Sequence, residues 1–179
     1  GSLSPPWGPV EATARAALTA VLAGVAFEVQ PAEVDERAAE AELNRWPQFT
    51  ADVDGQTIHF VHVVGEAKGK RPLLITHGWP GSVYEFWQAI GPLTFPSEHG
   101  GKAEDAFDLV IPSLPGYGFS GKPTSPLGQR ATAALWDKLM RDVLGYPAYL
   151  AQGGDWGSMV TSWLGKNHGT VDGKGGCRG

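Results

Sequence analysis

The sequence predicts an α/β protein built on a largely parallel sheet. From residue 71 onward, short apolar runs alternate with segments of helical periodicity, which is typical of strand–helix units in such a sheet. The chain has 179 residues, of which 42% are hydrophobic and 18% charged, so it holds enough apolar material for one core. A helical lead-in and an antiparallel hairpin are expected to precede the strand–helix units.

The lead-in, residues 11–44, is predicted to form two helices. The first is rich in alanine, and the second begins at Pro31, whose fixed φ suits a first helical turn, and continues through Leu43. The apolar stretch 14–27 is too short to span a bilayer and lacks the basic region and cleavage site of a signal peptide. We therefore expect no membrane segment in this chain, while an anchor upstream of Gly1 stays open as an alternative.

An antiparallel hairpin and three strand–helix units are expected next. Asp54-Gly55 is the two-residue signal of a type I′ turn between strands at 48–53 and 56–64. The three units are a strand at 73–76 with a helix near 83–90, a strand at 107–111 with a helix near 132–143, and a strand at 148–151 with a helix from Trp156 to about residue 166.

The expected domain organisation reflects these elements. Residues 1–47 form a helical N-terminal segment, and residues 48–168 form a partial core. Residues 169–179 are rich in glycine and show no periodicity, so we expect a disordered or foreign tail.

Charge and cysteine content exclude several classes of partner. A net charge of −5 provides no basic field for nucleic acid or an anionic membrane surface. Cys177 is the single cysteine, so neither a disulfide framework nor a cysteine-based metal site is expected. We predict no metal and no cofactor, and a reducing, cytoplasmic setting.

The segment 153–157, Gly-Gly-Asp-Trp-Gly, carries the predicted chemistry. It lies between a strand and a helix and has the form of a nucleophile elbow, in which small residues flank a nucleophile on a strained turn. The usual serine is replaced by Asp155. A carboxylate is already ionised at neutral pH, so it can attack an sp³ carbon without a base and form an ester of the enzyme.

Hydrolysis of such an ester requires donors for an oxyanion. The backbone N–H of Trp156, at the start of the elbow helix, is one candidate. The loop at 77–82, His-Gly-Trp-Pro-Gly-Ser, follows the 73–76 strand, and the N–H of Trp79 in this loop is the other.

Four segments in register resemble epoxide hydrolases of the microsomal and bacterial type. They are 77–82, 153–157, Pro-Gly-Tyr-Gly-Phe-Ser at 115–120, and the lead-in at 43–49 with the strand at 58–63. The resemblance covers roughly residues 40–168. It implies an α/β-hydrolase fold, truncated after the nucleophile elbow, and conversion of a small apolar epoxide and water to a vicinal diol.

The resemblance also implies that a cap domain with acid tyrosines, a second acid and a base histidine come after the elbow in the family. This chain ends about two dozen residues after Asp155, so we expect that alone it can be alkylated but cannot turn over. The strand at 148–151 is then expected at a sheet edge, where self-association becomes possible.

Further site residues are expected from the two loops and the elbow. The expected substrate-binding residues are Trp79, Tyr117, Phe119 and Trp156. The expected loop-shaping residues are His77, Gly78, Pro80, Gly153, Gly154 and Gly157.

Several polar and aromatic residues have a structural interpretation instead of a catalytic one. His59 and His62 lie on opposite faces of one strand and are expected to be satisfied or exposed there. His168 is too far along its helix to reach the ester, while Asp105 and Asp108 are expected to be exposed or capping. The tryptophans could be packing aromatics, and Tyr117 and Phe119 could serve the turn alone.

Two rival functions remain open at this point. A haloalkane dehalogenase also forms an alkyl ester on an elbow aspartate, but often has asparagine where this chain has Trp79. The other rival is a catalytically inactive fragment.

Overall fold

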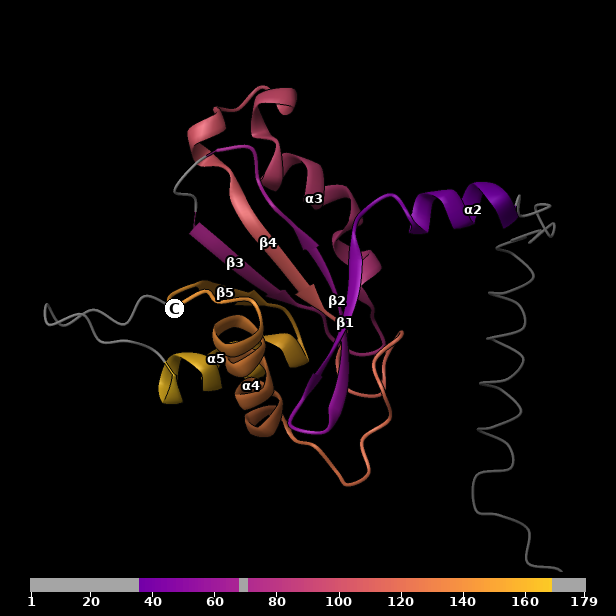
Figure 1. The fold of residues 1–179 in the computed structure, drawn as a ribbon, viewed down its shortest axis with the longest axis vertical. Coiled ribbons are helices and arrows are strands. Elements are labelled where there is room, and N and C mark those ends of the chain that lie inside the picture. Colours follow the sequence, from indigo (N-terminus) through magenta and orange to yellow (C-terminus); the bar gives the residue numbers. More distant parts are fainter. Residues whose placement is uncertain (1–35, 68–70, 169–179) are drawn as a thin grey trace, which may run out of the picture. The chain divides into compact units, whose positions relative to one another are not determined.

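The computed structural model describes residues 36–67 and 71–168 (Figure 1). The chain divides into two compact units, one ending at Leu43 and one beginning at Asn44. The first contributes one described helix, α2 (Glu36–Leu43), which confirms the second lead-in helix over those residues. The expected first helix, the start at Pro31 and the tail at 169–179 lie outside the described residues.

The second unit contains a mixed sheet in the order β1-β2-β4-β3-β5. Its strands are β1 (Gln48–Val53), β2 (Gln56–Val63), β3 (Arg71–Thr76), β4 (Phe107–Pro112) and β5 (Leu150–Gly153). The pairs β1–β2 and β2–β4 are antiparallel, whereas β3 pairs with β4 and with β5 in parallel. The predicted α/β class, with a hairpin joined to a parallel sheet, is confirmed.

The described helices of this unit lie between the parallel strands in the chain and, in the case of α5, after the last of them. They are η1 (Val83–Phe86), α3 (Trp87–Thr94), η2 (Pro96–His99), η3 (Ala103–Asp105), α4 (Gln129–Lys138), the π-helix η4 (Leu139–Val143) and α5 (Trp156–Asn167). Among the described residues, no helix is long and apolar enough to cross a membrane.

The β1–β2 hairpin turns at Asp54-Gly55, as expected. Both residues have positive φ, 54° and 78°, which a type I′ turn requires. The N–H of Gly55 donates to Oδ1 of Asp52 at 3.0 Å, so the turn is closed by a side chain as well as by the ladder.

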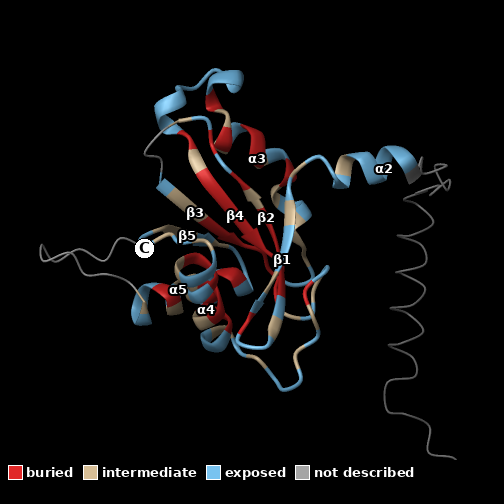
Figure 2. Ribbon diagram, viewed as in Figure 1, coloured by how far each residue is buried: buried red, intermediate tan, exposed pale blue. Residues whose placement is uncertain are grey.

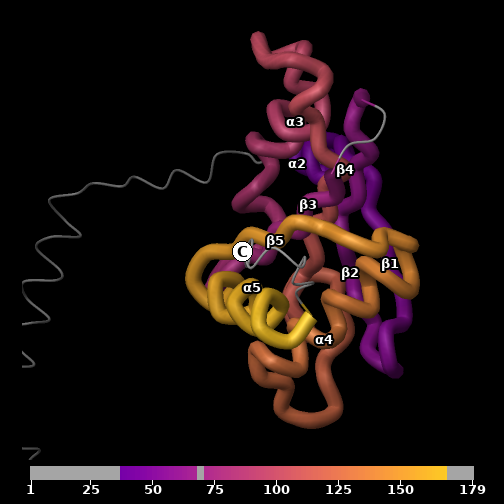
Figure 3. The backbone as a smooth tube through the Cα atoms, turned by 90° about the vertical axis from the view of Figure 1, so that its left-hand side faces the viewer, coloured from indigo at the N-terminus to yellow at the C-terminus, as the bar shows by residue number. Residues whose placement is uncertain are grey.

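Each face of the sheet packs against its own core (Figure 2). Leu109 and Ile111 of β4 pack with residues of α3, whereas Val110 between them packs with residues of α4 and α5. Both faces of β4 are therefore covered, and its residues from Asp108 to Pro112 are all buried. Helices α4 and α5 lie side by side (Figure 3).

The helix expected near 83–90 is two elements. A 3-10 turn, η1, comes first because Ser82 and Glu85 form a capping box at its start. Helix α3 then continues through Pro92 to Thr94, whose hydroxyl donates to the carbonyl of Ile90 at 2.7 Å. Packing of its buried face against the sheet extends the helix past a residue that normally ends one.

The strand expected at 148–151 lies two residues later, as β5. The hydroxyl of Tyr149 donates to Oδ1 of Asp137 at 2.7 Å, which holds the chain before β5 against α4. The strand then pairs with β3 up to its last residue.

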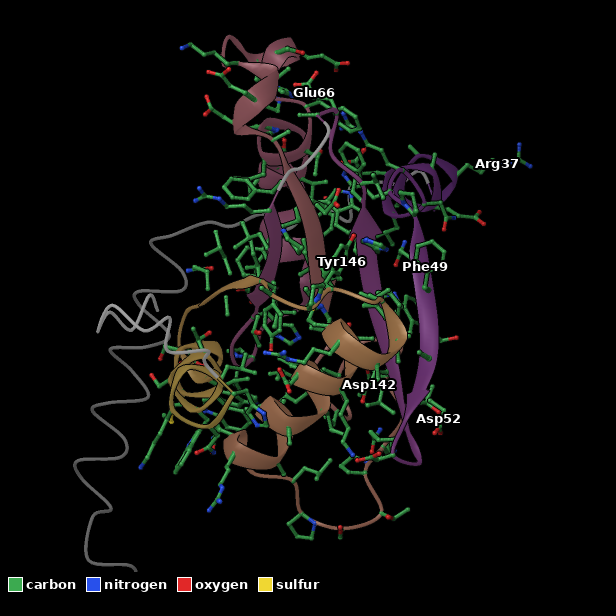
Figure 4. All side chains as sticks on the ribbon, turned by 60° about the vertical axis from the view of Figure 1, so that its left-hand side comes forward. Arg37, Phe49, Asp52, Glu66, Asp142 and Tyr146 are labelled. Carbon is green, nitrogen blue, oxygen red and sulfur yellow. The ribbon has the colours of Figure 1, made fainter. Side chains whose placement is uncertain are left out.

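The expectation that Asp108 is exposed or capping is wrong. It is 9% exposed, and its carboxylate accepts the N–H of Gly65 at 2.9 Å and the hydroxyl of Tyr146 at 3.2 Å. Tyr146 lies in the segment after η4 (Figure 4), and its hydroxyl is 3.0 Å from Nε2 of His62 on β2. Burial, and then the nearby Asp108 charge, raise the pKa of Tyr146 to about 12, so it stays protonated as a donor.

Candidate active site

Asp155 lies at the sharp turn between β5 and α5. Its φ of 50° and ψ of −123° are unusual for a residue with a side chain and cost about 1–3 kcal/mol. The turn is held by Ser158, whose N–H and hydroxyl both donate to the carbonyl of Asp155, at 3.1 Å and 2.6 Å. This is the strained elbow that the sequence predicts.

Two elbow glycines allow backbone segments to approach closely. A Cβ on Gly157 would lie 2.1 Å from the carbonyl oxygen of Thr76, and a Cβ on Gly153 would lie 2.4 Å from the carbonyl group of Gly157. The end of β3, the end of β5 and the start of α5 therefore meet without intervening side chains. Gly154 has no heavy atom within 4 Å of such a Cβ, so close packing does not require glycine there.

Two backbone amides act on the Asp155 carboxylate. The N–H of Trp79 donates to Oδ1 at 2.8 Å. This bond, followed by the N–H of Trp156 at the start of α5, lowers the pKa of Asp155 below its ordinary value of 3.8. Asp155 is thus ionised at neutral pH, and the residues expected as oxyanion donors surround it.

Gly78 brings the Trp79 loop close to the elbow. A Cβ on Gly78 would lie 2.5 Å from Cβ and 2.6 Å from Oδ1 of Asp155. The next peptide bond, Trp79–Pro80, is cis. Any side chain on residue 78 would occupy the place of the carboxylate.

His77 joins the two loops beside the site. It is fully buried, its Nδ1 is 2.9 Å from the carbonyl of Gly78, and its Nε2 is 3.1 Å from the N–H of Leu114. A carbonyl only accepts and an amide only donates, so the ring is neutral with its proton on Nδ1. Burial lowers the pKa of His77, in agreement with this form.

An open cleft of about 460 Å³ lies over Asp155. Its lining residues are Gly78, Trp79, Pro80, Gly81, Glu85, Phe86, Gln152, Gly154 and Asp155. The Trp79 side chain is 60% exposed. Glu85 and Gln152 were missed from the sequence, although the Ser-x-x-Glu spacing at 82–85 is a capping-box signal.

The other expected substrate-binding residues are not among those that line this cleft. Tyr117 and Trp156 have their rings 6.4 Å apart and line a second cavity of about 60 Å³. Phe119 lines neither cavity, is 74% exposed, and contacts the ring of His59 edge-on at 5.2 Å. Their substrate-binding roles stay predictions.

His59 is satisfied and buried rather than exposed. Its Nδ1 is 2.9 Å from Oγ of Ser113, and its Nε2 is 3.0 Å from Oε1 of Gln48. The N–H of His59 donates to Oγ of Ser120, which donates to the carbonyl of Ser113. These bonds fix both ends of the loop 113–120 that carries Tyr117.

None of the five histidines lines the cleft over Asp155, and all five lie in the described residues. His168 pairs through Nδ1 with Oδ2 of Asp137 at 3.1 Å, on the far end of α5. His99 is exposed on η2. Among residues 36–67 and 71–168, no cluster of histidine, cysteine and acidic residues could hold a metal ion.

Two family models match the chain. The one described as "Epoxide hydrolase N terminus" matches residues 31–86, and the one described as "alpha/beta hydrolase fold" matches residues 71–172. The second match includes the elbow and the loop that donates to it.

Curated relatives are similar over most of this chain. An epoxide hydrolase homologue of Stigmatella aurantiaca is 53% identical over 131 residues, and epoxide hydrolase 1 of Sus scrofa is 42% identical over 132. These matches cover 73% and 70% of this chain but only 30% and 29% of the relatives. The chain therefore spans less than a third of their length.

A solved structure shares the arrangement of the second unit. The epoxide hydrolase of Aspergillus niger matches with a TM-score of 0.66 and 40% sequence identity. The match covers 76% of this chain and 35% of that protein.

Proposed function

We propose, because this chain belongs to the α/β-hydrolase fold family, that Asp155 is the nucleophile of an epoxide hydrolase that forms vicinal diols. The observation that carries the proposal is the bond of 2.8 Å from the Trp79 N–H to the Asp155 carboxylate. It holds one oxygen of an ionised acid that lines the cleft. A serine elbow would instead require a base beside the nucleophile.

In the first step, a carboxylate oxygen of Asp155 attacks a ring carbon of the epoxide. The new C–O bond forms as the ring C–O bond breaks, and the ring oxygen keeps the electron pair and takes a proton from water or an acid. The product is a hydroxyalkyl ester of Asp155. The N–H groups of Trp79 and Trp156 keep the attacking acid ionised and oriented.

In the second step, water attacks the carbonyl carbon of the ester. The N–H groups of Trp79 and Trp156 are placed to stabilise the resulting oxyanion, which then collapses to release the diol and regenerate the carboxylate. This attack requires a base, and no histidine lines the cleft. We therefore expect the ester to accumulate on this chain.

Intact-mass measurement after incubation with styrene oxide tests the proposal. We expect a gain equal to one epoxide molecule, on the peptide that contains Asp155, without continued diol formation. The Asp155→Asn variant should gain nothing, because an amide is a poor nucleophile. An unmodified wild-type chain, or equal labelling of the variant, would refute the proposal.

A parallel incubation with a bromoalkane distinguishes the epoxide hydrolase hypothesis from the haloalkane dehalogenase hypothesis. Bromide release with no epoxide adduct would favour a dehalogenase. We expect the reverse, because Trp79 occupies the position where dehalogenases often have asparagine.

The class of epoxide, a role in detoxification and the cellular setting are proposed from the lining of the cleft and the cysteine content. Trp79, Pro80 and Phe86 give the cleft an apolar wall, which suits small aromatic and other xenobiotic epoxides and hence detoxification. The single cysteine supports a cytoplasmic setting.

Self-association through the sheet edge is also proposed. β5 is the last strand of the described sheet next to β3, so its outer backbone groups have no strand partner among the described residues. Sedimentation over a range of concentrations should show a growing dimer fraction. A monomer at all concentrations would contradict this proposal.

A further inference from the structure

The turn that carries the Trp79 amide is hydrogen-bonded at its end to a side chain of η1. Residues 78–81 form a tight turn, closed by the N–H of Gly81 donating to the carbonyl of Gly78 at 3.0 Å. The next amide, that of Ser82, donates to Oε1 of Glu85 at 3.1 Å. The Glu85 side chain therefore reaches back from η1 to the end of the turn.

Glu85 also fills the space beside Gly81. A Cβ on Gly81 would lie 1.3 Å from Oε1 of Glu85, so the carboxylate occupies the position that any side chain at residue 81 would take. Among the described residues, no salt bridge holds Glu85. Its carboxylate accepts a hydrogen bond from the turn, which makes capping rather than ion pairing the role of this side chain.

We infer that Glu85 is a positioning residue, which caps the Ser82 amide and thereby holds the Trp79 N–H on the Asp155 carboxylate. A turn that loses this cap would let the Trp79 amide move away from its distance of 2.8 Å. In this role Glu85 acts through the turn and not on the reacting atoms. Its kinetic consequence rests on the proposed function, whereas its effect on Asp155 does not.

The comparison of Glu85→Ala with Glu85→Gln separates the cap from the charge. Both variants remove one negative charge near Asp155, but only glutamine keeps an oxygen that can accept the Ser82 N–H. With ¹³C-labelled aspartate carboxyl groups, NMR titration of the full chain should give a higher pKa for Asp155 in Glu85→Ala than in Glu85→Gln. Unfolding alone would not give a higher Asp155 pKa in Glu85→Ala than in Glu85→Gln when both variants are folded.

The rate of ester formation with styrene oxide provides the second measurement. We expect Glu85→Ala to react about 5- to 30-fold more slowly than Glu85→Gln, as for the loss of one oriented hydrogen bond. Glu98→Ala, which removes an exposed glutamate from the 3-10 turn η2, is the matched control and should react like wild type.

Gly81→Ala tests the same contact from the other side. Its methyl group should displace the Glu85 carboxylate and slow the reaction to a similar degree, while the double variant Gly81→Ala/Glu85→Ala should be no slower than either single variant. Independent sites would instead multiply their effects.

The outcomes distinguish this inference from the proposed function. Equal Asp155 pKa values in Glu85→Ala and Glu85→Gln, or multiplying losses in the double variant, would overturn the positioning role. If the expected pKa difference is found while wild type forms no ester, Glu85 does position the amide and the proposed nucleophilic reaction fails.

Discussion

His77 connects two loops through atoms whose donor and acceptor roles cannot be exchanged. The Gly78 carbonyl needs its Nδ1 proton, and the Leu114 amide needs its Nε2 lone pair. Because the ring is fully buried, water cannot replace either bond. At the residue scale, stability and the placement of the Trp79 loop therefore depend on one neutral imidazole.

His77→Phe should lower the free energy of unfolding by about 1–3 kcal/mol. It leaves the buried Leu114 amide without a partner, and the Gly78 carbonyl keeps only its bond from the Gly81 N–H. Urea denaturation measures this loss. His99→Phe, at an exposed position on η2, is the control and should change stability by no more than about 0.5 kcal/mol. Similar midpoints for the two variants would contradict the bridging role.

At the scale of elements, helix α5 lies against the end of β3 only because Gly157 has no side chain. The obstacle that a Cβ would meet there is the backbone carbonyl of Thr76, which cannot rotate away as a side chain could. Gly165 belongs to the same helix, but a Cβ at that position would have nothing within 4 Å.

These two glycines give a matched pair of substitutions. Gly157→Ala should destabilise the chain by about 2–4 kcal/mol as α5 is pushed from β3. Gly165→Ala should stabilise it by about 0.5–1 kcal/mol through helix propensity. Opposite shifts in the urea midpoint are the expected result, and shifts of the same sign would count against the close approach.

The helices, the strands and the elbow could be predicted from local signals. Their exact limits and the long-range contacts that stabilise them could not. Periodicity and the Asp54-Gly55 signal sufficed for the strands and the hairpin. The continuation of α3 through Pro92 depends on packing against the sheet. The burial of Asp108 depends on partners 38 and 43 residues away, which no local pattern contains.

For the whole molecule, three histidines share one response to acid. Burial is the largest cause that lowers the pKa values of His59, His62 and His77 from 6.5, with Asp108 partly opposing it at His62. Below pH 6.5 the unfolded chain binds protons that the folded chain binds less readily. Stability should therefore fall as the pH decreases from 6.5 toward the lowered values.

Urea denaturation at about pH 7.5 and about pH 5 tests this response, with a slope of up to about 1.4 kcal/mol per pH unit for each histidine that stays neutral. The acidic groups with lowered pKa values have ordinary values of 4.5 for Glu66 and 3.8 for Asp137 and Asp155, so they act mainly at lower pH. His77→Phe should show a shallower fall than wild type. A constant stability across this range would contradict the prediction.

The backbone angle at Asp155 also limits how this site can be engineered. A φ of 50° disfavours β-branched residues most strongly and is best tolerated by glycine, asparagine and aspartate. A saturation library at this codon would therefore be filtered by folding before any selection for catalysis. Isoleucine, valine and threonine variants should be depleted from the soluble fraction, while asparagine should persist as a folded, unreactive form.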